Sequence, residues 1–422
     1  MGLLHVGAER TDVTALIASL RSRLPACVCR KSVALLTDDE VSALAAAAYL
    51  SHERVTGAVL GRNQLHGVAA RLRELGMTTV DLDRGAVLAP ARRAPGVSAG
   101  TVFLLTSGST GAPKLVAHSW DSLFTANRVR LEQPVSWWLT YRPGTYAWYQ
   151  MVTMWLFLSG NDLSVCGAGA TPGALDQARA AGVDALSCTP SFFRLLLVHC
   201  GMDRCRTLGL KRVTFGGEPV DDAVLQDART LFPQAVLTHI YASSEAGAAI
   251  VVRDGRAGFP ASYLDRPASS GIRLRVEDGV LLVRSPYASI EGEEWVHTGD
   301  LVEVVDGRVQ FLGRSGAAFI SVGGAKVPTR LVEACLLRHP DVLWCKVVAQ
   351  RAPLLGSVVA AQVVQRPGAA RERQDLEREL VRHCRNELPE VMCPRLFTVL
   401  DTVPVTAAFK TQLETGPARD RT

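Results

Sequence analysis

The segment from Thr101 to Trp120 holds the residue types that bind a polyphosphate. A run of apolar residues leads into a short stretch, Thr106 to Lys114, that brings hydroxyl groups, two glycines and one lysine together. Its candidate phosphate-binding residues are Thr106, Ser107, Gly108, Ser109, Thr110, Gly111 and Lys114. Glycines let backbone N–H groups converge on phosphate oxygens, hydroxyl groups donate hydrogen bonds, and the lysine supplies positive charge. The pattern predicts a polyphosphate-binding loop; the alternative, a Gly/Ser-rich linker, seldom follows an apolar strand so closely.

The same stretch differs from the Walker A loop of P-loop kinases and ATPases. That loop requires Gly-Lys followed by Ser or Thr. Here Pro113 precedes Lys114 and Leu115 follows it. A P-loop kinase or ATPase is therefore disfavoured.

Further motifs follow this loop in a fixed order, and together they resemble one family. They are Phe215-Gly216-Gly217-Glu218-Pro219, Ile240 to Glu245, Trp295 to Leu301, Gly313-Arg314 and the tail from Pro404 to Lys410. The chain resembles the adenylate-forming superfamily of acyl-CoA synthetases, peptide-synthetase adenylation domains and firefly-type luciferases, whose phosphate loop reads TSGSTGxPK. Because the loop begins as early as Thr106, the chain is most similar to the compact free-standing members.

The resemblance implies an ATP site with Mg²⁺. Tyr241 would stack on adenine, Asp300 would accept hydrogen bonds from both ribose hydroxyls, and Arg314 would contact ribose or phosphate. Ser244 would bond the α-phosphate or the substrate carboxylate, and Glu245 would ligate the magnesium ion. The implied ATP-binding residues are Thr106, Ser107, Gly108, Ser109, Thr110, Gly111, Lys114, Gly217, Glu218, Tyr241, Asp300 and Arg314. The implied catalytic residues are Lys410, Thr110, Ser244 and Glu245.

The resemblance also implies an acyl pocket, formed by Tyr146, Thr189, Gly216 and Ala242. Amino-acid-activating relatives carry an aspartate after the phosphate loop that pairs with the substrate amine. The corresponding region here, residues 137–149, contains aromatic residues and no acidic one. We therefore expect a planar or apolar carboxylic acid and not an α-amino acid, although simple core packing explains the aromatic residues equally well.

The C-terminal motifs depart from the family pattern. Gly316 and Ala317 stand where the family usually has two aspartates, and Gly316 takes the hinge position, where a glycine can absorb a large backbone rotation. By resemblance, Gly323 and Gly324 form the loop that lines the pantetheine tunnel in thioester-forming members. Lys410 falls on the catalytic lysine, with Phe409 in place of the preceding glycine.

The implied reaction joins a small carboxylic acid to ATP, giving an acyl-adenylate and pyrophosphate. Lys410 would bridge the carboxylate and the α-phosphate, and the C-terminal domain would then rotate to admit a thiol. Coenzyme A or carrier-protein phosphopantetheine is the expected acceptor, and an amine or nitrite is the alternative. A degenerate homologue that binds nucleotide or acyl ligand without turnover is a further alternative, raised by Gly316, Ala317 and Phe409.

The alternation of apolar strands with helical patterns predicts an α/β fold. In the large N-terminal domain we expect strands at 32–36, 55–60, 101–106, 136–140, 185–188, 212–215 and 236–241, and helices at 39–54, 191–199 and 221–232. A small antiparallel β unit follows, with strands at 271–277, 280–285, 301–305 and 309–312 and two Asp-Gly turns. A small mobile α+β C-terminal domain has strands at 319–322, 342–350, 357–364 and 395–400 and helices at 329–338 and 373–387. The predicted domains are 1–314 and 315–422.

Composition excludes several classes. The 422 residues are 48% hydrophobic and 21% charged, so disorder is excluded, and a net charge of +5 makes neither nucleic acid nor an anionic membrane the default partner. No signal segment or membrane span is recognised, and the ten cysteines show no zinc-ligand spacing, so we expect reduced thiols in the cytoplasm. The C-terminal arginines at 371, 373, 378, 382 and 385 form either a solvated helix face or a surface for an anionic partner such as coenzyme A or an acidic carrier protein.

Overall fold

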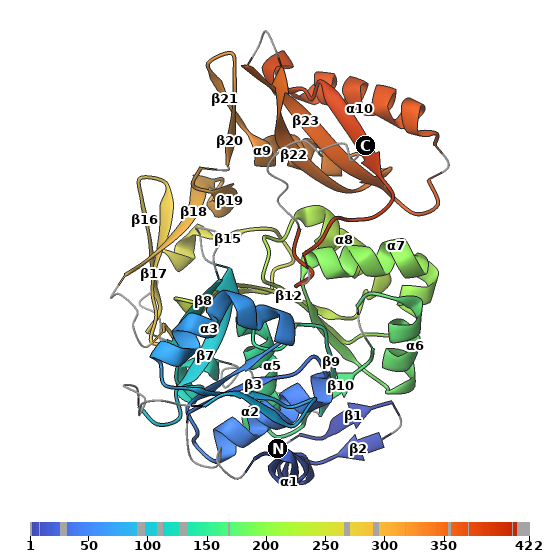
Figure 1. The fold of residues 1–422 in the computed structure, drawn as a ribbon. Coiled ribbons are helices and arrows are strands. Elements are labelled where there is room, and N and C mark those ends of the chain that lie inside the picture. Colours follow the sequence, from blue (N-terminus) through green and yellow to red (C-terminus); the bar gives the residue numbers. More distant parts are fainter. Residues whose placement is uncertain are drawn as a thin grey trace, which may run out of the picture.

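The computed structural model describes thirteen stretches of the chain. They are residues 2–7, 9–25, 32–90, 98–107, 113–125, 134–167, 169–265, 271–289, 295–316, 318–352, 356–369, 371–406 and 408–411. Figure 1 shows a large lower body, a β unit beside it and a smaller domain above. The smaller domain contains the helices and strands that follow β19. The predicted fold class, α/β with a small antiparallel β unit and a small α+β domain, is confirmed.

An eight-stranded sheet forms the centre of the large body, in the order β14-β13-β12-β11-β9-β10-β1-β2. Its six inner strands run parallel, and only the edge strands β2 and β14 are antiparallel. The strands are β1 Leu4–Val6, β2 Glu9–Thr11, β9 Val135–Leu139, β10 Asn161–Val165, β11 Ala185–Cys188, β12 Arg212–Gly216, β13 Val236–Ser243 and β14 Gly247–Val252. Their connecting helices are α5 Tyr146–Phe157, α6 Pro172–Ala180, α7 Pro190–Arg206 and α8 Asp222–Leu231.

A six-stranded sheet lies beside the first, in the order β6-β5-β3-β4-β7-β8. Its strands are β3 Val33–Leu36, β4 Gly57–Leu60, β5 Thr78–Asp81, β6 Ala86–Ala89, β7 Val102–Ser107 and β8 Pro113–His118, and its helices are α1 Val13–Arg23, α2 Glu40–His52, α3 Leu65–Glu74 and α4 Trp120–Leu123. Helix α2 is buried throughout Ser42 to Leu50 and packs with α5 in one apolar cluster that also takes residues from both sheets. An Ala-rich helix without a polar face is expected in such an interior position.

The β unit is antiparallel throughout, in the order β15-β19-β18-β17-β16. Its strands are β15 Phe259–Pro260, β16 Arg273–Glu277, β17 Val280–Arg284, β18 Val296–Val305 and β19 Arg308–Arg314. Both predicted Asp-Gly turns are present: Asp278 and Asp306 have φ of 49°, and the glycines that follow also have positive φ, as two-residue hairpin turns require. Strand β18 begins five residues before the predicted start at Leu301, so Asp300 lies within a strand.

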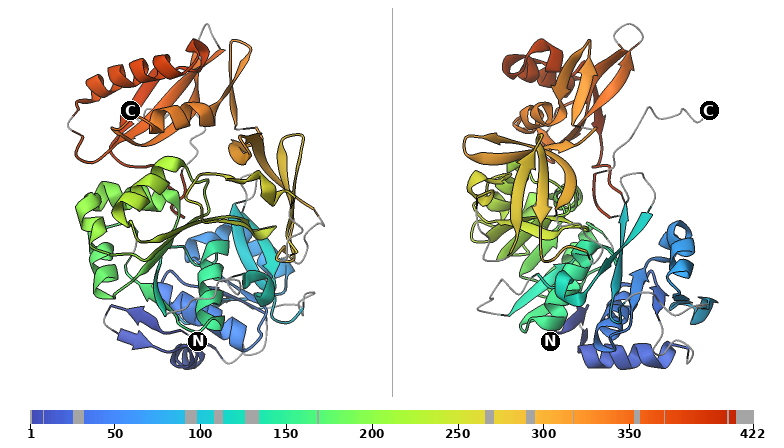
Figure 2. Two further views of the ribbon diagram at one scale, coloured as in Figure 1. Left: turned by 180° about the vertical axis from the view of Figure 1, so that it is seen from behind. Right: turned by 90° about the vertical axis from the view of Figure 1, so that its left-hand side faces the viewer.

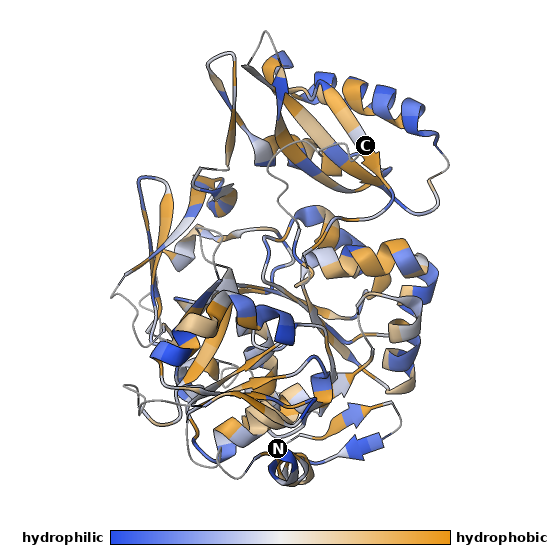
Figure 3. Cartoon of the chain, in the orientation of Figure 1, coloured by the Kyte–Doolittle hydropathy of each residue, from blue (hydrophilic) through white to orange (hydrophobic). Residues whose placement is uncertain are grey.

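The C-terminal domain places two helices on a three-stranded sheet (Figure 1). Its elements are the hairpin β20 Phe319–Val322 and β21 Ala325–Pro328, the sheet strands β22 Val342–Ala352, β23 Gly356–Gln365 and β24 Leu396–Leu400, and the helices α9 Thr329–Leu337 and α10 Arg373–Glu387. Hydrophilic and hydrophobic residues alternate along α10 (Figure 3), because Leu376, Leu380 and Cys384 are buried while the outer face is charged. Short 3₁₀ helices lie at Arg62–Gln64, Ala261–Tyr263 and Glu390–Met392. The predicted boundary at 314/315 coincides with the end of β19 and stays a prediction.

The C-terminal domain packs on α7 and α8 of the large body. Leu343 and Trp344 of β22 are buried in the same apolar cluster as residues of those two helices. Arg194 of α7, itself buried, donates from Nε to the carbonyl oxygen of Leu343 at 2.9 Å and pairs with Asp221 at 2.6 Å. Arg366 also reaches across, pairing with Asp227 at 2.7 Å. This contact fixes the domain in the orientation seen here.

Among the described helices, none combines the length and the apolar character needed to cross a bilayer.

Replacing Arg194 should destabilise the protein strongly. Burial would raise the pKa of Asp221, and the Arg194 guanidinium outweighs it and lowers that pKa, so R194M leaves a poorly solvated carboxylate without its partner. We expect the free energy of unfolding in urea to fall by about 3 kcal/mol. R206M is the matched control, because Arg206 lies on the same helix in an exposed pair with Asp203 and its loss should cost less than about 1 kcal/mol. Equal losses in the two variants would contradict this account.

Candidate active site

The predicted motifs meet at the carboxyl ends of the parallel strands. Strands β9, β11, β12 and β13 run parallel and side by side, so the segments that follow them lie along one edge of the sheet. Thr189 follows β11, Gly217 follows β12, and Ser244 follows β13. Ligands of open α/β sheets bind at this edge. Side chains that are far apart in the sequence are therefore candidates for one site.

The predicted phosphate loop connects two antiparallel strands. Thr106 of β7 pairs with Lys114 of β8, and Ser107 pairs with Pro113. Strand β8 was not predicted; a proline can open it because it is the first residue of an edge strand and needs no ladder donor there. Lys114 thus lies at the exposed start of β8 and not in the loop itself. The loop residues Gly108, Ser109, Thr110 and Gly111 lie outside the described residues.

Tyr241, Asp300 and Arg314 form one hydrogen-bonded group. The Tyr241 hydroxyl donates to Asp300 Oδ2 at 2.6 Å, and Arg314 Nε lies 2.9 Å from Asp300 Oδ1. Asp300 and Arg314 are direct cross-strand partners in β18 and β19, which explains their pairing. Burial, reinforced by the Asp300 carboxylate, raises the pKa of Tyr241 far above its usual value, so the phenol stays protonated.

One face of the Tyr241 ring is covered by Phe311, which sequence analysis did not single out. The ring centroids are 5.0 Å apart and the planes differ by 20°, a stacked arrangement. Phe311 lies on β19, three residues before Arg314, and this short spacing is the sequence feature that could have identified it. The stack holds the Tyr241 ring in place, and its role in binding adenine stays a prediction.

His118 supports the turn that carries Ser244 and Glu245. Its Nε2 donates to the Ser244 carbonyl oxygen at 2.7 Å, and its Nδ1 accepts from the Ser122 hydroxyl at 2.9 Å. Burial lowers the pKa of His118, so the neutral form with its proton on Nε2 fits both partners. Ser244 is half-buried and Glu245 is exposed beyond it. His118 was missed because its partner is 126 residues away.

Lys410 lies against Gly217. A Cβ atom at Gly217 would lie 3.4 Å from Lys410 Cε, and the glycine has φ of +82°, a backbone conformation that favours glycine. Part of the lysine is exposed, yet burial of the amine lowers the pKa of Lys410, with the Glu218 carboxylate opposing this shift and Arg314 adding to it. The tail amine therefore shares its surroundings with Glu218 and Arg314.

Glu218 binds the tail, and its predicted place among the ATP contacts stays a prediction. Its Oε1 accepts from the Thr411 backbone N–H at 2.5 Å, and its Oε2 accepts from the Ser191 N–H at 3.0 Å. The Ser191 and Thr411 hydroxyl oxygens lie 3.0 Å apart. Both carboxylate oxygens are thus engaged by the tail and by the first turn of α7.

Comparison with known proteins is consistent with this arrangement. The AMP-binding enzyme family model matches residues 7–301, and the model of the AMP-binding enzyme C-terminal domain matches residues 331–410. The chain belongs to the AMP-binding enzyme family. The predicted resemblance to the adenylate-forming superfamily is thereby confirmed.

Two curated relatives of this AMP-binding enzyme are named as ligases. It is 25% identical over 336 residues to the fatty acid–[acyl-carrier-protein] ligase ScoC of Streptomyces coeruleorubidus, covering 71% of this chain and 64% of that protein. It is also 25% identical over 357 residues to the peroxisomal benzoate–CoA ligase of Arabidopsis thaliana, covering 71% of this chain and 59% of that protein. The matches thus span about three fifths of the length of these relatives.

Solved structures share the fold of this AMP-binding enzyme. The anthranilate CoA ligase AuaEII in complex with anthranoyl-AMP superposes with a TM-score of 0.74 at 19% identity, over 97% of this chain and 92% of that one. ATP-bound MatB from Rhodopseudomonas palustris gives a TM-score of 0.71 at 20% identity, over 96% and 93%.

The predicted acyl-pocket residues do not line the main cavity at this edge. That cavity, of about 470 Å³, lies between the segments after β3 and β4 and the segment from Trp138 to Pro143. Tyr146 and Thr189 are buried, Gly216 and Ala242 are half-buried, and none of these four described residues is part of its lining.

Two of those residues, Tyr146 and Thr189, use their hydroxyl groups in hydrogen bonds within the protein. The Tyr146 hydroxyl accepts from the Ala248 N–H at 2.9 Å. The Thr189 hydroxyl accepts from the Phe192 N–H as the N-cap of α7 and donates to the Phe409 carbonyl oxygen. Thr189 therefore holds the tail, and its predicted acyl contact stays a prediction.

The hinge and tunnel glycines lie in two turns of the chain after β19. Gly316 is exposed with φ of +89° in the turn after β19. Gly323 and Gly324 form the turn between β20 and β21, and Figures 1 and 2 show this hairpin projecting away from the body. In the orientation seen here the predicted pantetheine loop and the predicted catalytic lysine are not brought together.

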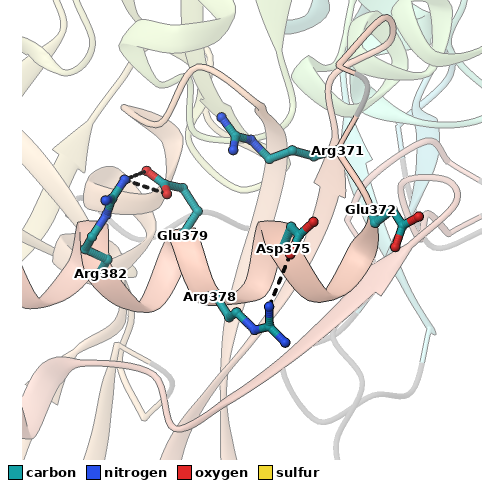
Figure 4. Close-up of a pocket in the computed structure, with 6 residues that line it drawn as sticks. All are labelled: Arg371, Glu372, Asp375, Arg378, Glu379 and Arg382. Carbon is teal, nitrogen blue, oxygen red and sulfur yellow. Dashed lines mark hydrogen bonds and ion pairs between the residues drawn. The ribbon is translucent and has the colours of Figure 1, made fainter.

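The arginine-rich face of α10 is neutralised by acidic neighbours. Figure 4 shows Arg382 bound to Glu379 and Arg378 bound to Asp375, at 2.6 and 3.3 Å. The other three pairs are Arg371 with Asp341, Arg373 with Asp401 and Arg385 with Glu390. These pairs favour the solvated helix face over the surface for an anionic partner.

The eight described cysteines are free thiols. Three donor atoms that could hold a metal ion, from Cys335, His383 and Glu387, lie within 4.8 Å of one another in the C-terminal domain. Glu387 is paired with Arg338, and His383 Nε2 lies 2.9 Å from the Cys335 carbonyl oxygen. Two of the three groups are thus occupied by protein contacts.

Glu40, at the cavity wall, should make stability depend on pH. Burial, with a smaller contribution from the charge of Asp39, raises the pKa of Glu40 from 4.5 to about 7. Because the folded-state pKa lies above the unfolded value, its stabilising contribution is complete below pH 4.5 and is lost as pH rises through about 7. Between pH 5 and 8 the wild type should therefore lose about 2 to 3 kcal/mol more unfolding free energy than E40Q.

Urea unfolding at the two pH values measures this difference. E74Q is the control, because Glu74 is an exposed carboxylate on the neighbouring helix α3. The same pH dependence in E40Q and the wild type would show that Glu40 is not the group responsible.

Proposed function

We propose that this AMP-binding enzyme condenses a carboxylic acid with ATP, forming an acyl-adenylate and pyrophosphate, and then transfers the acyl group to a thiol. The observation that carries the proposal is the position of Lys410, which lies against Gly217 and interacts electrostatically with Glu218 and Arg314. Family membership supports the first step, and the ligase names of the relatives support the second.

The first step brings two anions together, so positive charge and alignment are what the protein must supply. Lys410 would offset charge where the carboxylate oxygen attacks the α-phosphorus. Tyr241 and Asp300 would hold adenine and ribose in line. The exposed carboxylate of Glu245 suits Mg²⁺, which is held by few carboxylates plus phosphate oxygens and water and would neutralise the triphosphate.

The thiol acceptor would be coenzyme A or the phosphopantetheine of a carrier protein. The names of the two ligases above, one for coenzyme A and one for an acyl carrier protein, support this class. The tail would have to withdraw first, because Lys410 lies against Gly217 at the sheet edge and Phe409 is part of the cavity wall. A rotation about Gly316 that brings the Gly323-Gly324 turn to the site is part of the proposal.

A second candidate acceptor is an amine, and Glu40 is the observation that favours it. One carboxyl oxygen of Glu40 is buried without a hydrogen-bond partner among the described residues, and Glu40 lines the cavity. An amine that attacks the acyl carbon forms the C–N bond, expels AMP and must give up a proton. A carboxylate with a pKa near 7 can accept that proton at neutral pH.

Exchange of labelled pyrophosphate into ATP, screened over carboxylic acids, tests the first step and identifies the acid. With the active acid, K410A should lower the exchange rate by about 100-fold or more, because the charge opposite the reacting anions is lost. The same variant should transfer a preformed acyl-adenylate to the acceptor nearly as fast as the wild type.

The control K211A should leave both half-reactions unchanged, because Lys211 is an exposed lysine paired with Asp184. Equal losses of both half-reactions in K410A would count against the proposal. Supplying coenzyme A, a phosphopantetheinyl carrier protein and amines in turn to the loaded enzyme separates the two acceptor classes. Absence of exchange with every acid would favour the degenerate homologue.

A further inference from the structure

Phe409 has a backbone conformation that disfavours its side chain. Its φ is +52°, in the left-handed region where residues with a Cβ are strained. Its N–H donates to the Thr406 carbonyl oxygen at 2.9 Å, and the Thr406 N–H donates to the Lys410 carbonyl oxygen at 2.7 Å, so the turn that presents Lys410 is closed around it. A phenylalanine persists in such a turn only if its surroundings hold it there.

The large body supplies those surroundings. The Phe409 ring meets the Phe192 ring edge-on, with centroids 5.2 Å apart and planes at 85°. Its far end reaches Gly169, where a Cβ atom would lie 3.4 Å from Phe409 Cζ. The Phe409 carbonyl oxygen accepts the hydrogen bond from Thr189. The ring and the carbonyl group are therefore seated on two segments of the large body, α7 and the segment after β10.

The same ring is part of the wall of the 470 Å³ cavity. Lys410, the next residue, points to Gly217 instead. The two neighbouring side chains of the tail thus lie in different places: Lys410 lies on the proposed nucleotide side and Phe409 lies in the cavity wall. While Lys410 is at Gly217, the volume of the Phe409 ring is unavailable to anything that enters the cavity.

We propose that Phe409 is a positioning residue that holds Lys410 at the adenylation site. By the same contact it keeps the acceptor out of the 470 Å³ cavity until the tail withdraws. The inference rests on the proposed function. It makes the two half-reactions mutually exclusive through one side chain. A glycine at this position would relieve the backbone strain and remove the contacts of the ring with the large body. The two half-reactions would then be less strictly separated.

Variants at Phe409 test the positioning role in each half-reaction. In F409G the maximal rate of pyrophosphate exchange should fall at least 10-fold with KM for ATP changed less than 3-fold. Transfer from a preformed acyl-adenylate should be as fast as in the wild type or faster. F409L, which keeps apolar bulk, should recover most of the exchange rate. F157A removes an exposed phenylalanine with edge contacts to Trp120 and Phe124, and it should change neither rate.

Hydrogen–deuterium exchange of the tail peptide gives a readout without turnover. The Phe409 and Thr411 N–H groups are bonded to Thr406 and Glu218, and F409G should speed their exchange at least 10-fold while F409L stays near the wild type. Unchanged protection in F409G, or equal losses of both half-reactions, would overturn the positioning role. The two experiments can fail separately. If the wild type shows no pyrophosphate exchange, the proposed function is contradicted. If F409G still releases the tail in that case, the contacts that hold Phe409 are established all the same.

Discussion

The carboxylate of Glu218 joins the parts of the site that the sequence separates most widely. It accepts one backbone N–H from the start of α7 and another from the tail, 193 residues away. Hydrogen bonds to an ionised carboxylate are stronger than neutral ones, and the first turn of a helix favours a negative charge. Since Glu218 follows the Gly217 turn directly, its contact with Thr411 also brings Lys410 to Gly217. Together with the contacts of Phe409, this side chain therefore sets the position of the tail amine.

The fold prepares that interaction from both sides. The parallel strands place Thr189, Gly217 and Ser244 along one edge of the sheet. The contact of Leu343 and Trp344 with the large body, together with Arg194, holds the C-terminal domain where its tail can reach that edge. The buried ion pair adds geometric specificity to an apolar contact that could otherwise slide. Leaving this orientation means exposing apolar surface and unpairing Arg194 from Leu343. The orientation seen here is the one in which, under the proposed function, the acid would be activated.

Sequence patterns predicted what local chemistry determines. The Asp-Gly turns, the strand 185–188 and the helix 373–387 follow from turn preferences and apolar periodicity, and the motif order identified the family. Partners distant in sequence were not predictable in this way. The His118 contact with Ser244, the stack of Phe311 on Tyr241 and the tail contact of Glu218 each need the folded chain. Strand β8 was missed because its opening Pro113 is typical of a strand breaker. The hydroxyl contacts of Thr189 and Tyr146 within the protein were likewise not predictable, because their partners are distant in sequence.

A reversible cross-link between Ser191 and Thr411 tests the central claim most directly, namely that the docked tail is the state that activates the acid. Their hydroxyl oxygens lie 3.0 Å apart, so S191C/T411C places two thiols within reach of each other. The oxidised double variant should keep pyrophosphate exchange near the level of its reduced form and lose transfer to the acceptor, and reduction should restore transfer. Loss of exchange on oxidation, with transfer from a preformed adenylate retained, would contradict the account.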